Sequence, residues 1–141
     1  MTNNNPPAGN YIATKQVSNL LYIAGQTAKY EGKLKFTGKV GVDHGVDTAY
    51  AAAKLCALNM INHVKATLKS LDRVKSCIKL TVYINSADHF TEHAKVANGA
   101  SDLIIKIFKE KGQHVRSAIG CNSLPSDSLI AVDAIFEIDD A

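Results

Sequence analysis

Two charged side chains stand in mostly apolar stretches near the C-terminus, where they could take part in chemistry. Arg116 lies in the short segment VRSAIG, and Asp133 interrupts the apolar segment LIAVDAIFEI. An arginine guanidinium suits a planar carboxylate because its fork can donate two parallel hydrogen bonds. A carboxylate on an apolar strand face is either paired across an interface or functional. From the residues alone, an ordinary surface ion pair for Arg116 and a pairing across an interface for Asp133 are equally good interpretations.

The other patterns that could indicate catalysis are incomplete. The segment HFTEH, residues 89–93, matches the H-x-x-E-H zinc pattern, but no third ligand follows at a suitable spacing, so a solvated helix start is favoured. The segment GKLKFTGKV lacks the spacing and the final Ser or Thr of a phosphate-binding loop. No G-x-S-x-G turn supports a serine nucleophile, and nothing places a base beside Cys121. We therefore expect no metal site and no catalytic cysteine.

Length and composition favour one globular domain. The chain has 141 residues, of which 46% are hydrophobic and 21% charged, and domains typically contain about 100–200 residues. No apolar run approaches the roughly 20 residues that span a membrane, so no membrane partner is expected. The start MTNNNPPAGN is unlike a signal peptide, and the three cysteines form no C-x-x-C pair. These features predict a cytoplasmic location with free thiols.

The charge of the chain does not favour a dedicated nucleic-acid binder. The net charge is +3, the cations are spread along the chain, and only Arg73 and Arg116 are arginines. Nucleic-acid binders usually cluster their cations and interleave them with aromatic residues, whereas this chain has no Trp.

Turn signals and hydrophobic periodicity predict the elements that must position these residues. Residues 1–9 are polar and are interpreted as a loose lead-in to a single domain over residues 10–139. The expected elements are a hairpin of strands 11–17 and 20–26, a helix over 48–70 capped by Asp47, a strand over 74–85, a helix capped by Asp88 or Thr91 that continues to about 111, and strands over 115–120 and 129–138. This β-β-α-β-α-β-β order predicts an α+β fold with two layers, in which two helices back one mixed sheet.

The strand patterns also predict what the two sheet faces contact. In the strand over 74–85, alternation puts Ile78 on the core face and Cys77 on the opposite face. In the last strand, the face opposite the core still carries Leu129, Ala131 and Ile135. Two helices can cover only one face of the sheet, so we expect an oligomer in which sheet faces pack together.

Taken in order, several segments resemble the RidA/YjgF family, which is also called the L-PSP endoribonuclease-like family. The resemblance spans residues 6–138, and the segments that carry it are GNYIATKQVSNLLYIAGQ, LDRVKSCIKLTVYI, VANGASDLIIKIF and, most specifically, HVRSAIGCNSLPSDSLIAVDAIFEI. It implies a chorismate-mutase-like fold and a homotrimer with clefts between subunits. It also implies hydrolysis of reactive enamines and imines, such as 2-aminoacrylate and 2-iminobutyrate, to 2-keto acids and ammonia, with no cofactor.

The resemblance assigns roles to particular residues. Arg116 would hold the substrate carboxylate, and Asp133, at a position that is usually Glu, would orient water or move a proton. Tyr11, the backbone at Gly25, and Asn98 would complete the substrate-binding cleft.

Two departures from the family pattern leave other functions open. Ala24 stands where many members have Ser, and Ala118 stands where many have Cys. The alternatives are an endoribonuclease that acts on single-stranded RNA, with Arg116 on a phosphate, and a non-catalytic trimer that binds small carboxylates.

Overall fold

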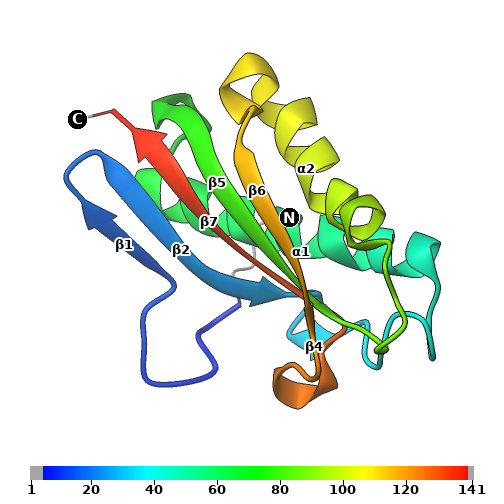
Figure 1. Cartoon of the computed structure of the whole chain (residues 1–141). Helices are drawn as coiled ribbons and strands as arrows, with labels where there is room; N and C mark the ends of the chain where they lie inside the picture. The colour runs from blue at the N-terminus through cyan, green and yellow to red at the C-terminus, as the bar shows by residue number, and fades with distance from the viewer. Residues whose placement is uncertain (1–4, 140–141) are drawn as a thin grey trace.

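The computed structural model, which describes residues 5–139, contains one mixed sheet with two helices packed on one of its faces (Figure 1). The sheet has five strands in the order β1-β2-β7-β5-β6, and only the β5–β6 pair is parallel. The strands are β1 (Thr14–Val17), β2 (Leu20–Thr27), β5 (Val74–Asn85), β6 (Val115–Cys121) and β7 (Ile130–Ile138). A small separate hairpin contains β3 (Lys29–Tyr30) and β4 (Lys33–Leu34). The expected α+β architecture is confirmed.

Both predicted helices form, but their caps differ from the expectation. Helix α1 (Val46–Leu68) begins after Gly45, so Asp47 is not its N-cap and lies in the first turn, where its charge suits the helix N-terminus. Helix α2 (His93–Phe108) begins after Glu92, later than either predicted cap. In the loop before α2, the backbone N–H of Ala87 donates to Val40 and that of Phe90 donates to Ala87, and a short 3-10 turn, Lys109–Gly112, follows α2.

The simple alternation predicted for the strand over 74–85 is wrong at its first half. The pairing of β5 with β7 shifts between Val74 and Ser76 and again between Cys77 and Lys79. Each irregularity changes which face the following side chains occupy. Cys77 is therefore buried in the core at 1% exposure, whereas Ile78 is 37% exposed.

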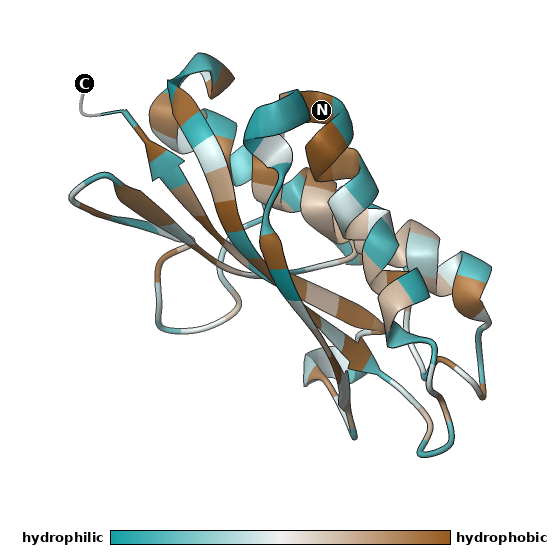
Figure 2. Cartoon of the chain, turned by 45° about the horizontal axis from the view of Figure 1, so that its top comes forward, coloured by the Kyte–Doolittle hydropathy of each residue, from teal (hydrophilic) through white to brown (hydrophobic). Residues whose placement is uncertain are grey.

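The sheet face away from the helices carries apolar side chains that this chain leaves exposed. Tyr22, Val115 and Ile119 have exposed fractions of 43%, 65% and 44%, and Figure 2 shows hydrophobic stretches along the strands. Leu129, which the sequence placed on this face, is instead fully buried, with its backbone N–H donating to Phe36. We call this surface the open sheet face. No helix among residues 5–139 is long and apolar enough to cross a membrane.

Candidate functional site

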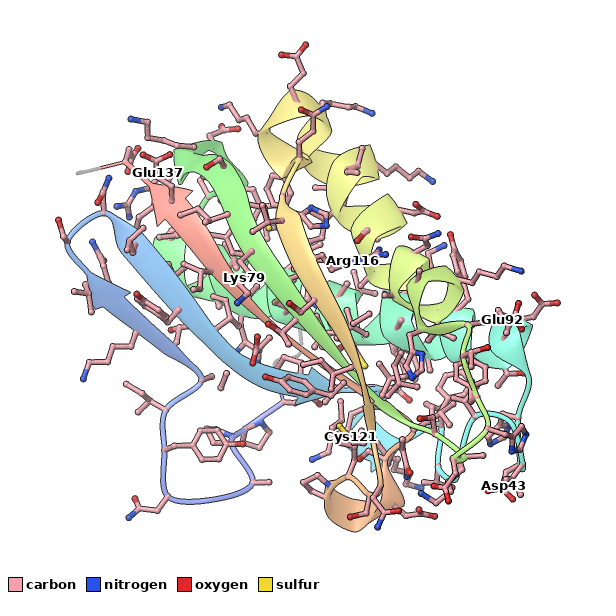
Figure 3. All side chains as sticks on the ribbon, in the orientation of Figure 1. Asp43, Lys79, Glu92, Arg116, Cys121 and Glu137 are labelled. Atoms are coloured by element: carbon pink, nitrogen blue, oxygen red, sulfur yellow. The ribbon has the colours of Figure 1, made fainter. Side chains whose placement is uncertain are left out.

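Arg116 lies on β6, at the edge of the sheet, and its side chain points toward α2 (Figure 3). Its Nη1 donates to Oδ1 of Asn98 at 2.8 Å and to Oγ of Ser101 at 3.0 Å. Its Nη2 makes a long contact of 3.5 Å with the carbonyl oxygen of Ala94. These three partners follow one face of α2, since residues three or four apart in a helix are neighbours. The structure thus brings the predicted Arg116 and Asn98 together.

The guanidinium of Arg116 has only neutral hydrogen-bond partners. Among residues 5–139, no carboxylate lies within ion-pair distance of it, and the ion pairs found there are Arg73–Asp139 and Lys95–Glu92. The side chain is half-buried and lines a shallow depression of about 340 Å³ with Ile105, Gln113 and Asp102, whose carboxylate lies beyond ion-pair distance of the guanidinium. A guanidinium that lines an open depression and forms no direct ion pair within residues 5–139 is suited to binding an anion. The ordinary surface ion pair considered from the sequence is therefore wrong for Arg116.

Two further residues beside Arg116 were not singled out from the sequence. Nε2 of His114 lies 2.8 Å from Oγ of Ser101, and Nδ1 of His114 lies 2.6 Å from the carbonyl oxygen of Gly112. Ser101 could have been found because it lies three residues after Asn98, on the same helix face. His114 precedes β6 in an irregular segment, and no sequence pattern places it there.

Asp133 lies on the open sheet face, on the other side of the sheet from Arg116. Arg116 is level with Leu80 of β5, which is fully buried and faces the helices, whereas Asp133 is level with Thr81, the next residue. Side chains alternate between faces along a strand. Within one chain the two predicted catalytic residues therefore do not share a site.

Tyr83 is a third residue that the sequence did not single out. Its hydroxyl donates to Oδ2 of Asp133 at 2.9 Å. Partial burial, and then the hydrogen bond to Asp133, raise the pKa of Tyr83. The phenol therefore stays protonated near neutral pH and keeps donating to the carboxylate.

Tyr11 and Gly25 line a pocket of about 270 Å³ next to the open sheet face. Ala131 of β7 also lines it. The pairing of β2 with β7 shifts between Ile23 and Gln26, so Gly25 lies in a bulge level with Asp133. Because no atom of residues 5–139 lies within 4 Å of the position that a Cβ would take at Gly25, its backbone is open to approach from this part of the chain. The structure thus brings Arg116 and Asn98 together beside α2, and Tyr11 and Gly25 together at this pocket. Asp133 lies level with Gly25 on the neighbouring strand but is not among the residues that line the pocket.

Two of the three cysteines, Cys56 and Cys77, are buried in the core, which favours structural roles for them. Cys56 is fully buried, and burial raises its pKa strongly; burial also raises the pKa of Cys77 to about 12. Thiols protonated at neutral pH are poor nucleophiles. Cys121 is half-buried at the end of β6 (Figure 3).

Replacing all three cysteines by Ser is expected to leave most of the ligand binding intact. The change buries hydroxyls at two core sites, and each costs about 1–3 kcal/mol of stability if its hydrogen bonding is poor. Calorimetric titration checks the binding, and urea denaturation checks the stability. Loss of binding in a triple variant that remains folded would contradict this prediction.

The H-x-x-E-H segment does not assemble a metal site in this fold. Glu92 forms an ion pair with Lys95, and the ring of His93 contacts that of Phe90 edge-on. Over the described part of the chain, no three His, Cys, Asp or Glu side chains gather closely enough to hold a metal ion.

Comparisons with known proteins agree with this architecture. The family model described as "YjgF/chorismate mutase-like, putative endoribonuclease" matches residues 3–138, so the chain belongs to this family. It is 41% identical over 133 residues to Protein TCP17 of Trypanosoma cruzi, covering 94% of this chain and 83% of that protein.

Solved structures give the same result. Atu1372 from Agrobacterium tumefaciens, a protein of unknown function, has a TM-score of 0.91 and 43% identity, over 95% of this chain and 86% of that one. A "putative endoribonuclease" from Shewanella oneidensis has a TM-score of 0.94 and 34% identity, over 96% of this chain and 90% of that one.

Proposed function

We propose that the protein hydrolyses reactive 2-enamine and 2-imine acids, of the 2-aminoacrylate and 2-iminobutyrate type, to 2-keto acids and ammonia. The observation that carries the proposal is the guanidinium of Arg116, which is held by Asn98 and Ser101 and has no acidic partner among residues 5–139. A 2-imino acid carries a carboxylate next to its reactive carbon. A residue that binds this carboxylate holds the reactive carbon at a defined position. Because imines react readily with water, this positioning is the main requirement of the hydrolysis.

The reaction needs few protein groups. The enamine tautomerises to an imine, the oxygen of water attacks the imine carbon, and ammonia leaves as the carbonyl forms. The nitrogen must gain protons while the attacking water loses them, so one nearby group that accepts and returns a proton assists both steps. Asp133 takes this role in the proposal, with Tyr83 donating to one carboxylate oxygen and leaving the other free for water. No step requires a metal or an organic cofactor.

The proposed site is completed by a neighbouring subunit. Arg116 and Asp133 lie on opposite sides of one sheet, so in this proposal a second chain brings the Asp133 of its own open sheet face to the Arg116 of the first. The exposed apolar residues of the open sheet face, including Tyr22 and Ile119, supply a surface for that contact. The expectation that three subunits assemble comes from the family resemblance.

We expect a homotrimer in solution. Because a stable interface buries about 20–30 residues on each side, the assembly should not dissociate at micromolar concentrations. Sedimentation equilibrium measures the mass directly, and a charged substitution on the open sheet face, Ile119→Asp, should shift the population toward monomer. A wild-type monomer at micromolar concentration would contradict the shared site.

The activity is tested by coupling the protein to a PLP-dependent threonine dehydratase and following the release of 2-keto acid. Wild type should accelerate release, Arg116→Ala should abolish the acceleration, and Arg73→Ala should keep it, because Arg73 pairs with Asp139 elsewhere. Single-stranded RNA is offered to the same three proteins. RNA cleavage that Arg116→Ala abolishes would favour the endoribonuclease, and binding of 2-ketobutyrate without turnover would favour a carboxylate-binding trimer.

A further inference from the structure

The two protons on Nη1 of Arg116 are both directed at protein acceptors. One hydrogen bond goes to Oδ1 of Asn98 and the other to Oγ of Ser101, at 2.8 and 3.0 Å. A guanidinium carries five N–H donors in a rigid plane, so fixing Nη1 fixes the whole group. The edge formed by Nε and Nη2 is left for a ligand, because within residues 5–139 its one contact is the 3.5 Å contact of Nη2 with Ala94.

The hydroxyl of Ser101 is itself oriented by His114. A carbonyl oxygen only accepts, so the 2.6 Å contact between Gly112 and Nδ1 of His114 assigns a proton to Nδ1. In the neutral ring, Nε2 then carries a lone pair, which accepts the hydroxyl proton of Ser101 at 2.8 Å. The lone pairs on Oγ of Ser101 are thereby left to Arg116.

The surroundings hold this chain of hydrogen bonds in place. Ser101 is only 7% exposed, so water cannot readily replace its partners. Gly112 is buried, and a Cβ there would come within 2.7 Å of the carbonyl oxygen of Ile104. The missing side chain lets the turn after α2 lie close enough to the helix for His114 to reach Ser101.

We propose that Ser101 and His114 are positioning residues for Arg116, which hold the Nε/Nη2 edge of its guanidinium toward the ligand and so make the site selective for carboxylates. This inference rests on the proposed function in taking Arg116 as the carboxylate anchor. It adds that the selectivity depends on a serine and a histidine that do not touch the ligand.

The test is a double-mutant cycle read out by calorimetry, with 2-ketobutyrate and its uncharged amide as probes. Ser101→Ala should weaken binding of 2-ketobutyrate about fivefold to tenfold and leave binding of the amide unchanged, because the fork matches only the carboxylate. Ser101→Thr, which keeps the hydroxyl, should restore most of the affinity.

In an Arg116→Ala background, Ser101→Ala should have no further effect. His114→Phe should behave like Ser101→Ala, and Ser123→Ala, an exposed serine in the loop after β6, like wild type.

A second measurement needs no ligand. Hydrogen exchange at Nη1 of Arg116, the nitrogen that donates to Asn98 and Ser101, followed by NMR in the folded protein, should speed up in Ser101→Ala and in His114→Phe. Unchanged exchange, or equal weakening of both probes, would mean that Ser101 and His114 serve only local stability and would overturn the inference. Arg116-dependent binding that Ser101→Ala leaves intact overturns this inference alone. A wild type that binds no 2-keto acid overturns the proposed function together with it.

Discussion

Replacing Arg116 by Lys is expected to weaken binding of 2-ketobutyrate about tenfold to a hundredfold, and Arg116→Ala is expected to weaken it further. An ammonium is a point charge without the planar fork, so Lys loses at least one of two charge-assisted hydrogen bonds, each worth roughly 1.5–3 kcal/mol. About 1.4 kcal/mol corresponds to a tenfold change in affinity. Calorimetric titration of the three proteins measures the difference.

The folded state should tolerate both changes. The partners that Arg116 would leave behind are neutral, and Asn98 is exposed, so no buried charge is stranded. Arg73→Ala is the matched control, since it removes the other arginine of the chain. Equal affinities in wild type, Arg116→Lys and Arg116→Ala would remove Arg116 from the site and the proposed function with it.

Replacing Gly99 by Ala is expected to lower the free energy of unfolding by about 2 kcal/mol. Gly99 lies in α2 where this helix crosses α1, and a Cβ there would come within 2.1 Å of the backbone oxygen of Tyr50 and 3.2 Å of Ala53. A backbone atom cannot rotate away, so the helices must separate, and overpacking of this kind costs about 1–3 kcal/mol or more. In an exposed helix interior the same change would stabilise by about 1 kcal/mol.

Urea denaturation measures this effect and its sign. Gly45→Ser is the control: it also adds a Cβ, but nothing lies within 4 Å of that position, and serine is a good N-cap for α1. The control should be neutral or stabilising. A Gly99→Ala protein as stable as wild type would show that α1 and α2 are not in close backbone contact.

Local signals in the sequence were sufficient to predict the two helices and the five strands of the main sheet in their order along the chain. The first strand, however, begins at Thr14 and not at residue 11, and the β3–β4 hairpin was not among the expected elements. The strand over 74–85 has the predicted bounds, and the hairpin turn at Ser18 has the positive φ of 56° that a tight turn requires. The helix over residues 46–68 follows from its Ala-rich stretch without Gly or Pro. The helix caps and the strand faces were predicted less well. The register shift in β5 buries Cys77 and exposes Ile78, and the alternation of residue types in the sequence gives no sign of that shift.

The chemical types at the site, above all Arg116, Asn98 and Asp133, could be named from the sequence through their family resemblance. Only the tertiary structure decided that Arg116 and Asp133 lie on opposite sides of the sheet. It also decided that Ser101 accepts a hydrogen bond from the guanidinium of Arg116 and contacts His114. Local patterns carry information over a few residues, where backbone propensity and periodicity act. Contacts such as those between β6 and α2 depend on how whole elements pack and on which edge of the sheet is left free, and no short segment of the chain encodes these.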